Sequence, residues 1–568
     1  MAEEISAQGW SAGKKAASEN RKEKQGGGAL AALWRRLQLR FSDTDTDGLS
    51  GGVFYTFIAV FAAVLSVNVF CGSGLAMDLV EHIHASWLVS TGKVPYRDFF
   101  EHHNPLLWYL FAPITQLFYR QIEILYAARL TAIAVWGVVI YQLYGLTRDY
   151  FGGRGCARYT LMLLFLLSAV WRDAQNLRPD TFMLAAMLAG IRCLFRYLDT
   201  QQRRELVWSF ICWSAAFWFL QKALVPGAGF ATAVLWLLWR RKIRGGDFLA
   251  AAAIAAALNG AVVFCLWQAG ALEAWFKWNF LFNALVPGYL GDYTSHVGDW
   301  LPVYAVLLGG AAVRFFPTDD KGTVLVVTAV MSMTGLFFFA PHPQYYAPFF
   351  LLAAPLAAQG VVRLRGCRRQ AVNIILCVAA AVSLYTALPE AKRREKWQKY
   401  VQKLEFILDN TAADELLLND LSSYMTNLYN PDADYMWFSF DRMVKLAVLE
   451  GFTDFSYDET FKKTMPRFGA AGNIPDTMEL YHVQWLLERN TRVYSLLKLD
   501  ERWRQELVKI DFSVWPMDMD FVKAHYKWEC FGEGVCFWRR LSGAAADGAA
   551  GDKASAGEGA RAGTVGEK

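Results

Sequence analysis

Long apolar runs separated by short charged islands leave few folds open to this chain. Each run is close to the ~20 residues with which an α-helix crosses a bilayer, where every backbone polar group must be paired within the segment. With 55% hydrophobic residues and a positive mean hydropathy, the chain predicts an all-α polytopic membrane protein with about eleven spans. The expected spans lie near 53–70, 124–147, 157–171, 180–198, 206–222, 223–240, 247–267, 300–315, 322–340, 345–362 and 371–388.

Basic residues fall in every alternate loop between these runs. Arg148 and Arg154 lie in one such loop, and Arg240, Arg241 and Lys242 lie in another. Because loops rich in Lys and Arg stay in the cytoplasm, the alternation places the N-terminus inside and the remaining loops outside. The net charge of +5 is gathered in these clusters and therefore indicates no nucleic-acid partner. An Ala- and Gly-rich composition without a signal peptide favours the inner (plasma) membrane of a bacterium, and the endoplasmic reticulum stays open.

The composition divides the chain into four parts. Residues 1–48 are polar and of low complexity, which predicts a flexible cytoplasmic tail. Residues 49–390 hold the predicted spans. An odd number of spans sends residues 391–542 outside, where they are long enough for a small α+β domain. Residues 543–568, rich in Ala and Gly, are expected to be disordered.

The predicted outer domain ends in a candidate hairpin. Cys530 and Cys536 flank its turn at Gly532-Glu533-Gly534, which would place them opposite each other across two strands. An outer compartment allows a disulfide there, but such cross-strand bridges are often strained, so both the disulfide and two free thiols stay open.

The first outer loop gathers acids, histidines and aromatic residues between two apolar runs. A charge left in hydrocarbon costs roughly 2.5 kcal/mol or more, so these groups belong in water at a membrane face or in a functional pocket. If 76–90 is a helix, its spacing places Asp78, Glu81 and His82 on one face. The apolar segment from Pro105 is too short to span and is expected to lie against the membrane. We therefore predict an active-site loop with interfacial helices.

A metal site is one possible use of the histidines in this loop. Glu101, His102 and His103 are consecutive, and His82 lies nearby in the sequence. Carboxylates and imidazoles are ligands for Zn²⁺, and carboxylates also bind Mg²⁺. Adjacent histidines point at one ion only if the loop bends. A divalent metal and histidines that hydrogen-bond or orient an acceptor both stay open.

The second outer loop ends in Asn176-Leu177-Arg178-Pro179-Asp180 before a span. Proline suits the first turn of a helix, and an acid there complements the helix dipole. This gives Asp180 a structural role. The functional alternative is a second carboxylate that faces the first across an extracytoplasmic cavity.

Taken in order, these motifs resemble a known superfamily. An Asp after the first span, then GKVPYRDFFEHHNPL, then NLRPD before the fourth span is similar to the polyprenyl-phosphate-sugar-dependent glycosyltransferases of GT-C fold, the superfamily of protein O-mannosyltransferases and lipid A aminoarabinose transferases. The resemblance covers roughly residues 50–390 and is strongest over 76–113 and 172–185. It implies a GT-C-like membrane domain and an inverting transfer of a sugar from polyprenyl phosphate.

The resemblance also implies roles for individual residues. Asp78 matches the acid that acts as general base or orients the acceptor. Many relatives have two adjacent acids there, whereas Leu79 follows here, so Glu81 shares the assignment. Asp180 matches the second-loop acid, and Lys222 matches a lysine that contacts lipid-linked phosphate. A polar-aromatic turn before a late span is matched by His342, Tyr345 and Tyr346.

The chemistry of such a transfer suits these residue types. A sugar on a lipid phosphate has a good leaving group, so the enzyme must deprotonate an acceptor hydroxyl, align it and stabilise the departing phosphate. A carboxylate can take the proton, and outer cations can stabilise the phosphate. The candidates for phosphate and substrate binding are Arg178, Lys222, Lys93, Arg97 and the adjacent Tyr96.

We therefore expect a glycosyltransferase, specific for a hexosyl or pentosyl donor, that acts on an envelope lipid, glycan or protein. A transporter or flippase is the alternative, and it predicts ionisable groups near the bilayer centre and internal repeats. A non-catalytic subunit of an envelope complex is a third possibility, in which the carboxylates would be dispensable.

Overall fold

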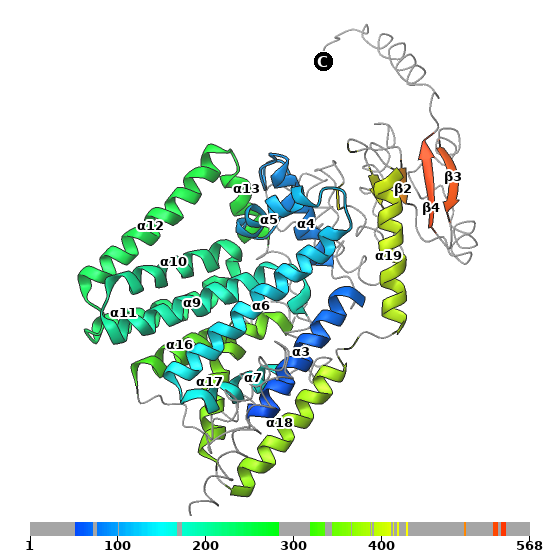
Figure 1. Ribbon diagram of the computed structural model, residues 1–568. Helices are drawn as coiled ribbons and strands as arrows, with labels where there is room; N and C mark the ends of the chain where they lie inside the picture. The colour runs from blue at the N-terminus through cyan, green and yellow to red at the C-terminus, as the bar shows by residue number, and fades with distance from the viewer. Residues whose placement is uncertain are drawn as a thin grey trace, which may run out of the picture.

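The computed structural model of the chain is a bundle of α-helices with a small β-sheet near the C-terminal end (Figure 1). It describes residues 51–71, 77–99, 101–166, 173–282, 319–334, 343–364, 366–386 and 391–410, with short pieces at 388, 413, 417–419, 428–429, 493–495, 526–531 and 535–540. The predicted tails at 1–48 and 543–568 lie outside these residues.

Six helices in the described ranges are long and apolar enough to cross a membrane. Each coincides with a predicted span, which confirms the polytopic helical class. Burial differs among them: 61% of the apolar stretch of α9 is inside the structure, against 11% for α12, so α9 is central and α12 peripheral. The six are α3 (Gly51–Cys71), α6 (Glu123–Tyr150), α9 (Pro179–Thr200), α11 (Leu224–Trp239), α12 (Gly245–Gln268) and α18 (Gly366–Thr386).

Shorter helices occupy other predicted spans. Pro348 lies in the first turn of α17 and Pro355 in its interior, and proline inside a helix removes a hydrogen bond. The predicted span at 300–315 lies outside the described residues, so the total of eleven stays a prediction. The shorter helices are α7 (Gly153–Phe165), α10 (Arg203–Phe219), α16 (Asp320–Thr334) and α17 (Ala347–Arg363).

The loop that the sequence predicts to be the first outer one forms two short helices at one end of the bundle (Figure 1). α4 (Met77–Ser90) is followed by Gly92, whose φ of 89° lies where only glycine rests without strain. α5 (Leu106–Leu117) has 12 residues, or about 18 Å at 1.5 Å per residue, and cannot cross a bilayer. Both helices agree with the prediction that this loop folds back instead of spanning.

The part after the last span begins with a helix that stands beside the bundle (Figure 1). Four strands form one sheet in the order β1-β2-β4-β3, with β1 and β2 parallel and the other pairs antiparallel. The register of β3 and β4 pairs Cys530 with Cys536, while the disulfide and the domain boundaries stay predictions. The elements are α19 (Ala391–Asn410), β1 (Leu417–Asn419), β2 (Val493–Ser495), β3 (Tyr526–Phe531) and β4 (Val535–Arg540).

Candidate active site

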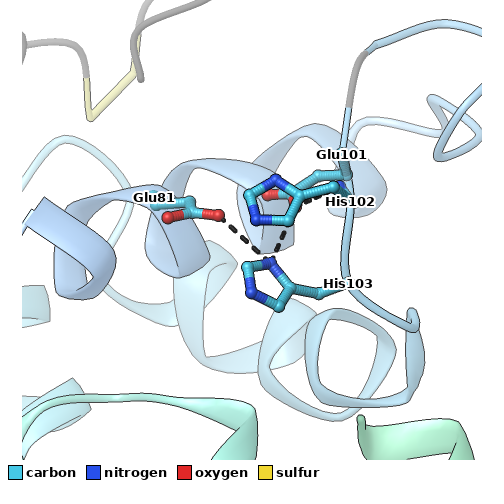
Figure 2. Close-up of side chains that lie close together, drawn as sticks. All are labelled: Glu81, Glu101, His102 and His103. Carbon is cyan, nitrogen blue, oxygen red and sulfur yellow. Dashed lines mark hydrogen bonds and ion pairs between the residues drawn. The ribbon is translucent and has the colours of Figure 1, made fainter. Parts of the chain in front are cut away.

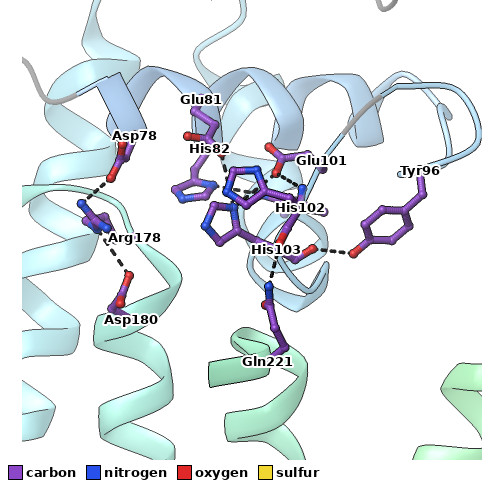
Figure 3. A network of polar contacts seen from close by, with 11 residues as sticks. Asp78, Glu81, His82, Tyr96, Glu101, His102, His103, Arg178, Asp180 and Gln221 are labelled. Atoms are coloured by element: carbon purple, nitrogen blue, oxygen red, sulfur yellow. Dashed lines mark hydrogen bonds and ion pairs between the residues drawn. The ribbon is translucent and has the colours of Figure 1, made fainter. Parts of the chain in front are cut away.

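The front face of α4 carries the three residues that the spacing predicted to lie together (Figure 3). Glu81 and His82 are buried, and the Asp78 side chain is 23% exposed. Trp108 of α5 donates its indole N–H to Nδ1 of His82 at 3.2 Å. Because an indole nitrogen only donates, His82 must accept at Nδ1 and carry its hydrogen on Nε2. The contact joins α5 to the face of α4 that bears the acids.

Arg178 lies between Asp78 and Asp180 (Figure 3). Its guanidinium forms an ion pair with Asp78 through Nη1 and a second with Asp180 through Nε at 3.3 Å. Pro179 opens α9, and the residue before a proline is driven to an extended conformation, which Arg178 adopts with φ −132° and ψ 143°. The two carboxylates therefore come together across one arginine, which leaves this group with an excess of negative charge.

Charge and burial act in opposite directions on Asp78. Burial alone raises the pKa of its carboxyl, but the positive charges of the Arg178 guanidinium and of Lys222 outweigh it and hold the pKa below its usual value of 3.8. Burial lowers the pKa of His82 to about 4. At neutral pH the site thus holds an ionised Asp78 beside a neutral imidazole.

A second cluster shares Glu81 with this group and joins α4 to the following loop (Figure 2). One ligand atom each from Glu81, Glu101, His102 and His103 lies within 4.8 Å of all the others. Nδ1 of His103 is 3.4 Å from a carboxylate oxygen of Glu81 and 3.4 Å from one of Glu101. The loop bends so that the centres of the His102 and His103 rings lie 4.1 Å apart. Glu81 thereby joins the three consecutive residues that the sequence suggested as metal ligands.

The donor set of this cluster fits a divalent cation. Burial lowers the pKa of His102 to about 3 and that of His103 well below its ordinary value, so both imidazoles are neutral, the form that binds metals. Two buried carboxylates are costly without a compensating positive charge. Two carboxylate oxygens and two imidazole nitrogens are ligands of the kind that Zn²⁺ takes.

Three hydrogen bonds from side chains to backbone carbonyls fix the loop that carries the histidines. Gln221 donates its amide N–H to the His102 carbonyl at 2.7 Å, and Asn104 donates to the Phe217 carbonyl at 2.5 Å. Tyr96 is buried, and its hydroxyl donates to the His103 carbonyl at 2.6 Å. Its φ of 70° is rare for a bulky residue. Tyr96 thus holds the backbone at His103, and its substrate contact stays a prediction.

The remaining predicted residues divide between the site and the surface. Lys222, in the turn Gln221–Ala223, lies with Nζ 3.5 Å from the ring centre of Tyr345, a favourable cation–π contact, and its charge lowers the pKa of Asp78. Tyr346, the residue after Tyr345, is also buried. Arg97 pairs with Asp98 at 2.7 Å and faces solvent. His342 lies outside the described residues.

An apolar groove begins next to Lys222. It has a volume of about 610 Å³ and lies between α10, α11 and α12. Its lining extends from Ala223, directly before α11, to Leu235 of α11, twelve positions or about 18 Å of helix. Ser214 and Asn259 are its polar lining residues, and their side chains hydrogen-bond to each other at 2.9 Å. The groove can therefore take an apolar chain that leads to the cations of the site.

Sequence reasoning missed two residues that hold the site together, Gln221 and Asn104. Asn104 directly follows His103 and Gln221 directly precedes Lys222, so each stands beside a residue with a predicted role and shows no separate signal of its own. Their partners are 119 and 113 residues away in the chain, so the spacing of the sequence gave no indication of the contacts.

Comparison with solved structures finds membrane transferases. ArnT from Cupriavidus metallidurans, bound to undecaprenyl phosphate, is 14% identical over 67% of this chain and 75% of ArnT, with a TM-score of 0.48. Archaeal oligosaccharyltransferase AglB from Archaeoglobus fulgidus, in complex with an inhibitory peptide and a dolichol-phosphate, is 11% identical over 86% of this chain and 74% of AglB, with a TM-score of 0.44.

The sequence matches no protein-family model and no curated protein. The reaction is therefore inferred from the residues of the site.

Proposed function

We propose that the chain is a membrane glycosyltransferase that moves a sugar from a polyprenyl-phosphate donor to an extracytoplasmic lipid, glycan or protein. The observation that carries the proposal is an ionised Asp78 near two cations, Arg178 and Lys222, the second of which directly precedes Ala223 in the lining of an apolar groove. A base, phosphate-binding charges and room for a lipid chain are the three parts that such a transfer needs.

Asp78 is the proposed base. The acceptor oxygen forms a bond to the anomeric carbon while the bond from that carbon to the phosphate oxygen breaks, and the hydroxyl proton goes to the Asp78 carboxylate. A carboxylate with a lowered pKa is a weak base, so it takes the proton only as the new bond makes the hydroxyl acidic. Displacement from the opposite side inverts the anomeric centre.

Arg178 and Lys222 are the proposed partners of the departing phosphate. Arg178 can meet two phosphate oxygens at once, whereas Lys222 acts as a point charge. Both lie at the site with Asp78, whereas Arg97 is engaged with Asp98 at the surface. We therefore give Arg97 a lesser part than the sequence suggested.

The groove between α10, α11 and α12 is the proposed place for the isoprenoid chain. At about 18 Å it takes the first isoprene units next to the phosphate, and the rest of the chain lies in the bilayer. Glu81, Glu101, His102 and His103 would hold a divalent ion, Zn²⁺ or Mg²⁺, which when bound supplies positive charge at the site.

The test is transfer of radiolabelled sugar from polyprenyl-phosphate carriers to an envelope extract by the purified protein. We expect Asp78→Asn to lose on the order of 10²-fold or more and Asp180→Asn to lose less. Glu273→Gln is the matched control, because this acid is 82% exposed and pairs only with the nearby Lys277 in the described structure. If wild type transfers nothing from any carrier, or Asp78→Asn equals Glu273→Gln, the proposal fails and transport or a non-catalytic role takes its place.

A further inference from the structure

The rear face of α4 carries two buried side chains, His84 and Trp87. At 100° per residue, Trp87 lies roughly 180° and His84 about 120° around the helix from Asp78, so this face points away from Asp78. α4 has 14 residues, too few to span a bilayer, and its position is therefore set by its contacts on both faces.

The rear face is covered by Leu428 and Tyr429, which follow it by more than three hundred positions. Nδ1 of His84 lies 3.3 Å from the Leu428 carbonyl. Because a carbonyl only accepts, the imidazole N–H donates. The ring of Tyr429 meets Trp87 edge to face at 5.6 Å, and both Leu428 and Tyr429 are buried.

Tyr429 also reaches the second helix of the same loop. Its hydroxyl donates to the carbonyl of Phe118, which caps the C-terminal end of α5, at 2.8 Å. Its ring lies 5.4 Å from that of Tyr119. One side chain from the outer part of the chain thus contacts both α4 and the end of α5.

We infer that Leu428 and Tyr429 form a latch that fixes α4, and that Tyr429 is a positioning residue for Asp78. On its front face, α4 is held by the ion pair between Asp78 and Arg178 and by the hydrogen bond from Trp108 to His82. On the rear, the latch resists the rotation or tilt that would part Asp78 from Arg178. The catalytic part of this inference rests on the proposed function, whereas the mechanical part does not.

Hydrogen exchange of the full chain in lipid nanodiscs tests the mechanical part. We expect Tyr429→Ala to speed exchange of the amides of α4 and α5 about 10-fold or more, while α9 and α12 stay unchanged. The matched control is Trp397→Ala, because Trp397 of α19 packs on Tyr126 and Arg129 of α6. Unchanged exchange in α4, or an equal rise in Trp397→Ala, overturns the latch.

Kinetics test the positioning role. We expect Tyr429→Ala to lower kcat about 10-fold with little change in KM for the lipid donor, and Tyr429→Phe, which keeps the ring contacts, to recover most of the rate. A loosened α4 with an unchanged kcat overturns the positioning role. If wild type shows no transfer, the proposed function fails, and the exchange experiment still decides whether the latch exists.

Discussion

The two ends of the helix bundle use charge differently. At the end that the sequence predicts to be the inner one, Arg203 pairs with Asp247 at 2.7 Å and Lys321 with Asp199 at 2.5 Å, each cation with its own acid and with one partner well exposed. At the opposite end, which the sequence predicts to be the outer one, Asp78 and Asp180 share Arg178, while Glu81 and Glu101 are buried beside neutral histidines.

This difference distinguishes charged residues that stabilise the fold from charged residues that can take part in a reaction. Ion pairs near the surface contribute little to the free energy of unfolding. These pairs join neighbouring helices. An excess of acids inside a protein is unfavourable unless a ligand, a metal or a proton completes it, and such groups cluster at functional sites. The outer end is therefore where a variant should change the reaction, and the inner end is where it should change only stability.

Replacing one arginine at each end gives the largest expected contrast. Arg178→Gln leaves Asp78 and Asp180 without the guanidinium between them and removes a phosphate-binding charge, so we expect transfer to fall on the order of 10²-fold or more. Arg203→Gln should leave the rate within about two-fold. Initial rates of sugar transfer at saturating donor measure the effect of each variant. An equal loss of rate in Arg178→Gln and Arg203→Gln would contradict the different roles of the two ends.

Metal content sharpens the comparison at the outer cluster. Glu101→Gln removes one carboxylate ligand, so we expect the affinity for Zn²⁺ to fall by about 10-fold or more, as measured by metal analysis after dialysis against graded free Zn²⁺. Glu273→Gln serves as the control with an unchanged content. Wild-type protein that retains no divalent ion at any concentration would rule out the metal.

The acid dependence of stability follows from Asp78. Its pKa in the folded state lies below the ordinary 3.8, so its ion pair stabilises the fold above that value and the contribution is lost as the pH falls through the folded pKa. We expect Asp78→Asn to lose less stability than wild type between pH 5 and pH 3, by about 1 kcal/mol. Thermal unfolding at the two pH values measures it, and a steeper loss in the variant would show the opposite sign.

The smallest effect is expected at the inner end. Lys321→Gln removes the pair with Asp199 and a cation–π contact with Tyr150 at 4.4 Å, which together are worth about 0.5–1 kcal/mol. The melting temperature should fall slightly and the transfer rate should not change. A large loss of rate would mean that charge at the inner end also reaches the reaction.

Sequence reasoning succeeded where the controlling interactions are local. The apolar runs fixed the positions of α3, α6 and α9, and the i, i+3, i+4 spacing placed Asp78, Glu81 and His82 on one face. Pro179 likewise indicated the start of a helix, and α9 begins at this residue.

It failed where distant parts of the chain decide. The close approach of the His102 and His103 rings depends on the strained turn at Tyr96 and on an amide from Gln221, and neither could be read from two adjacent histidines. Tyr429 gave no signal at all, because its partners lie in α4 and α5.

The groove between α10, α11 and α12 has a consequence for how the protein meets its donor. α12 is peripheral, and the groove beside it has a mostly apolar lining from α11 and α12, so under the proposed function a donor reaches it from within the bilayer. A ligand that enters this way arrives by diffusion in two dimensions. The quantity that fills the groove is then the mole fraction of the carrier in one leaflet, so the supply of donor is set by the composition of the membrane itself.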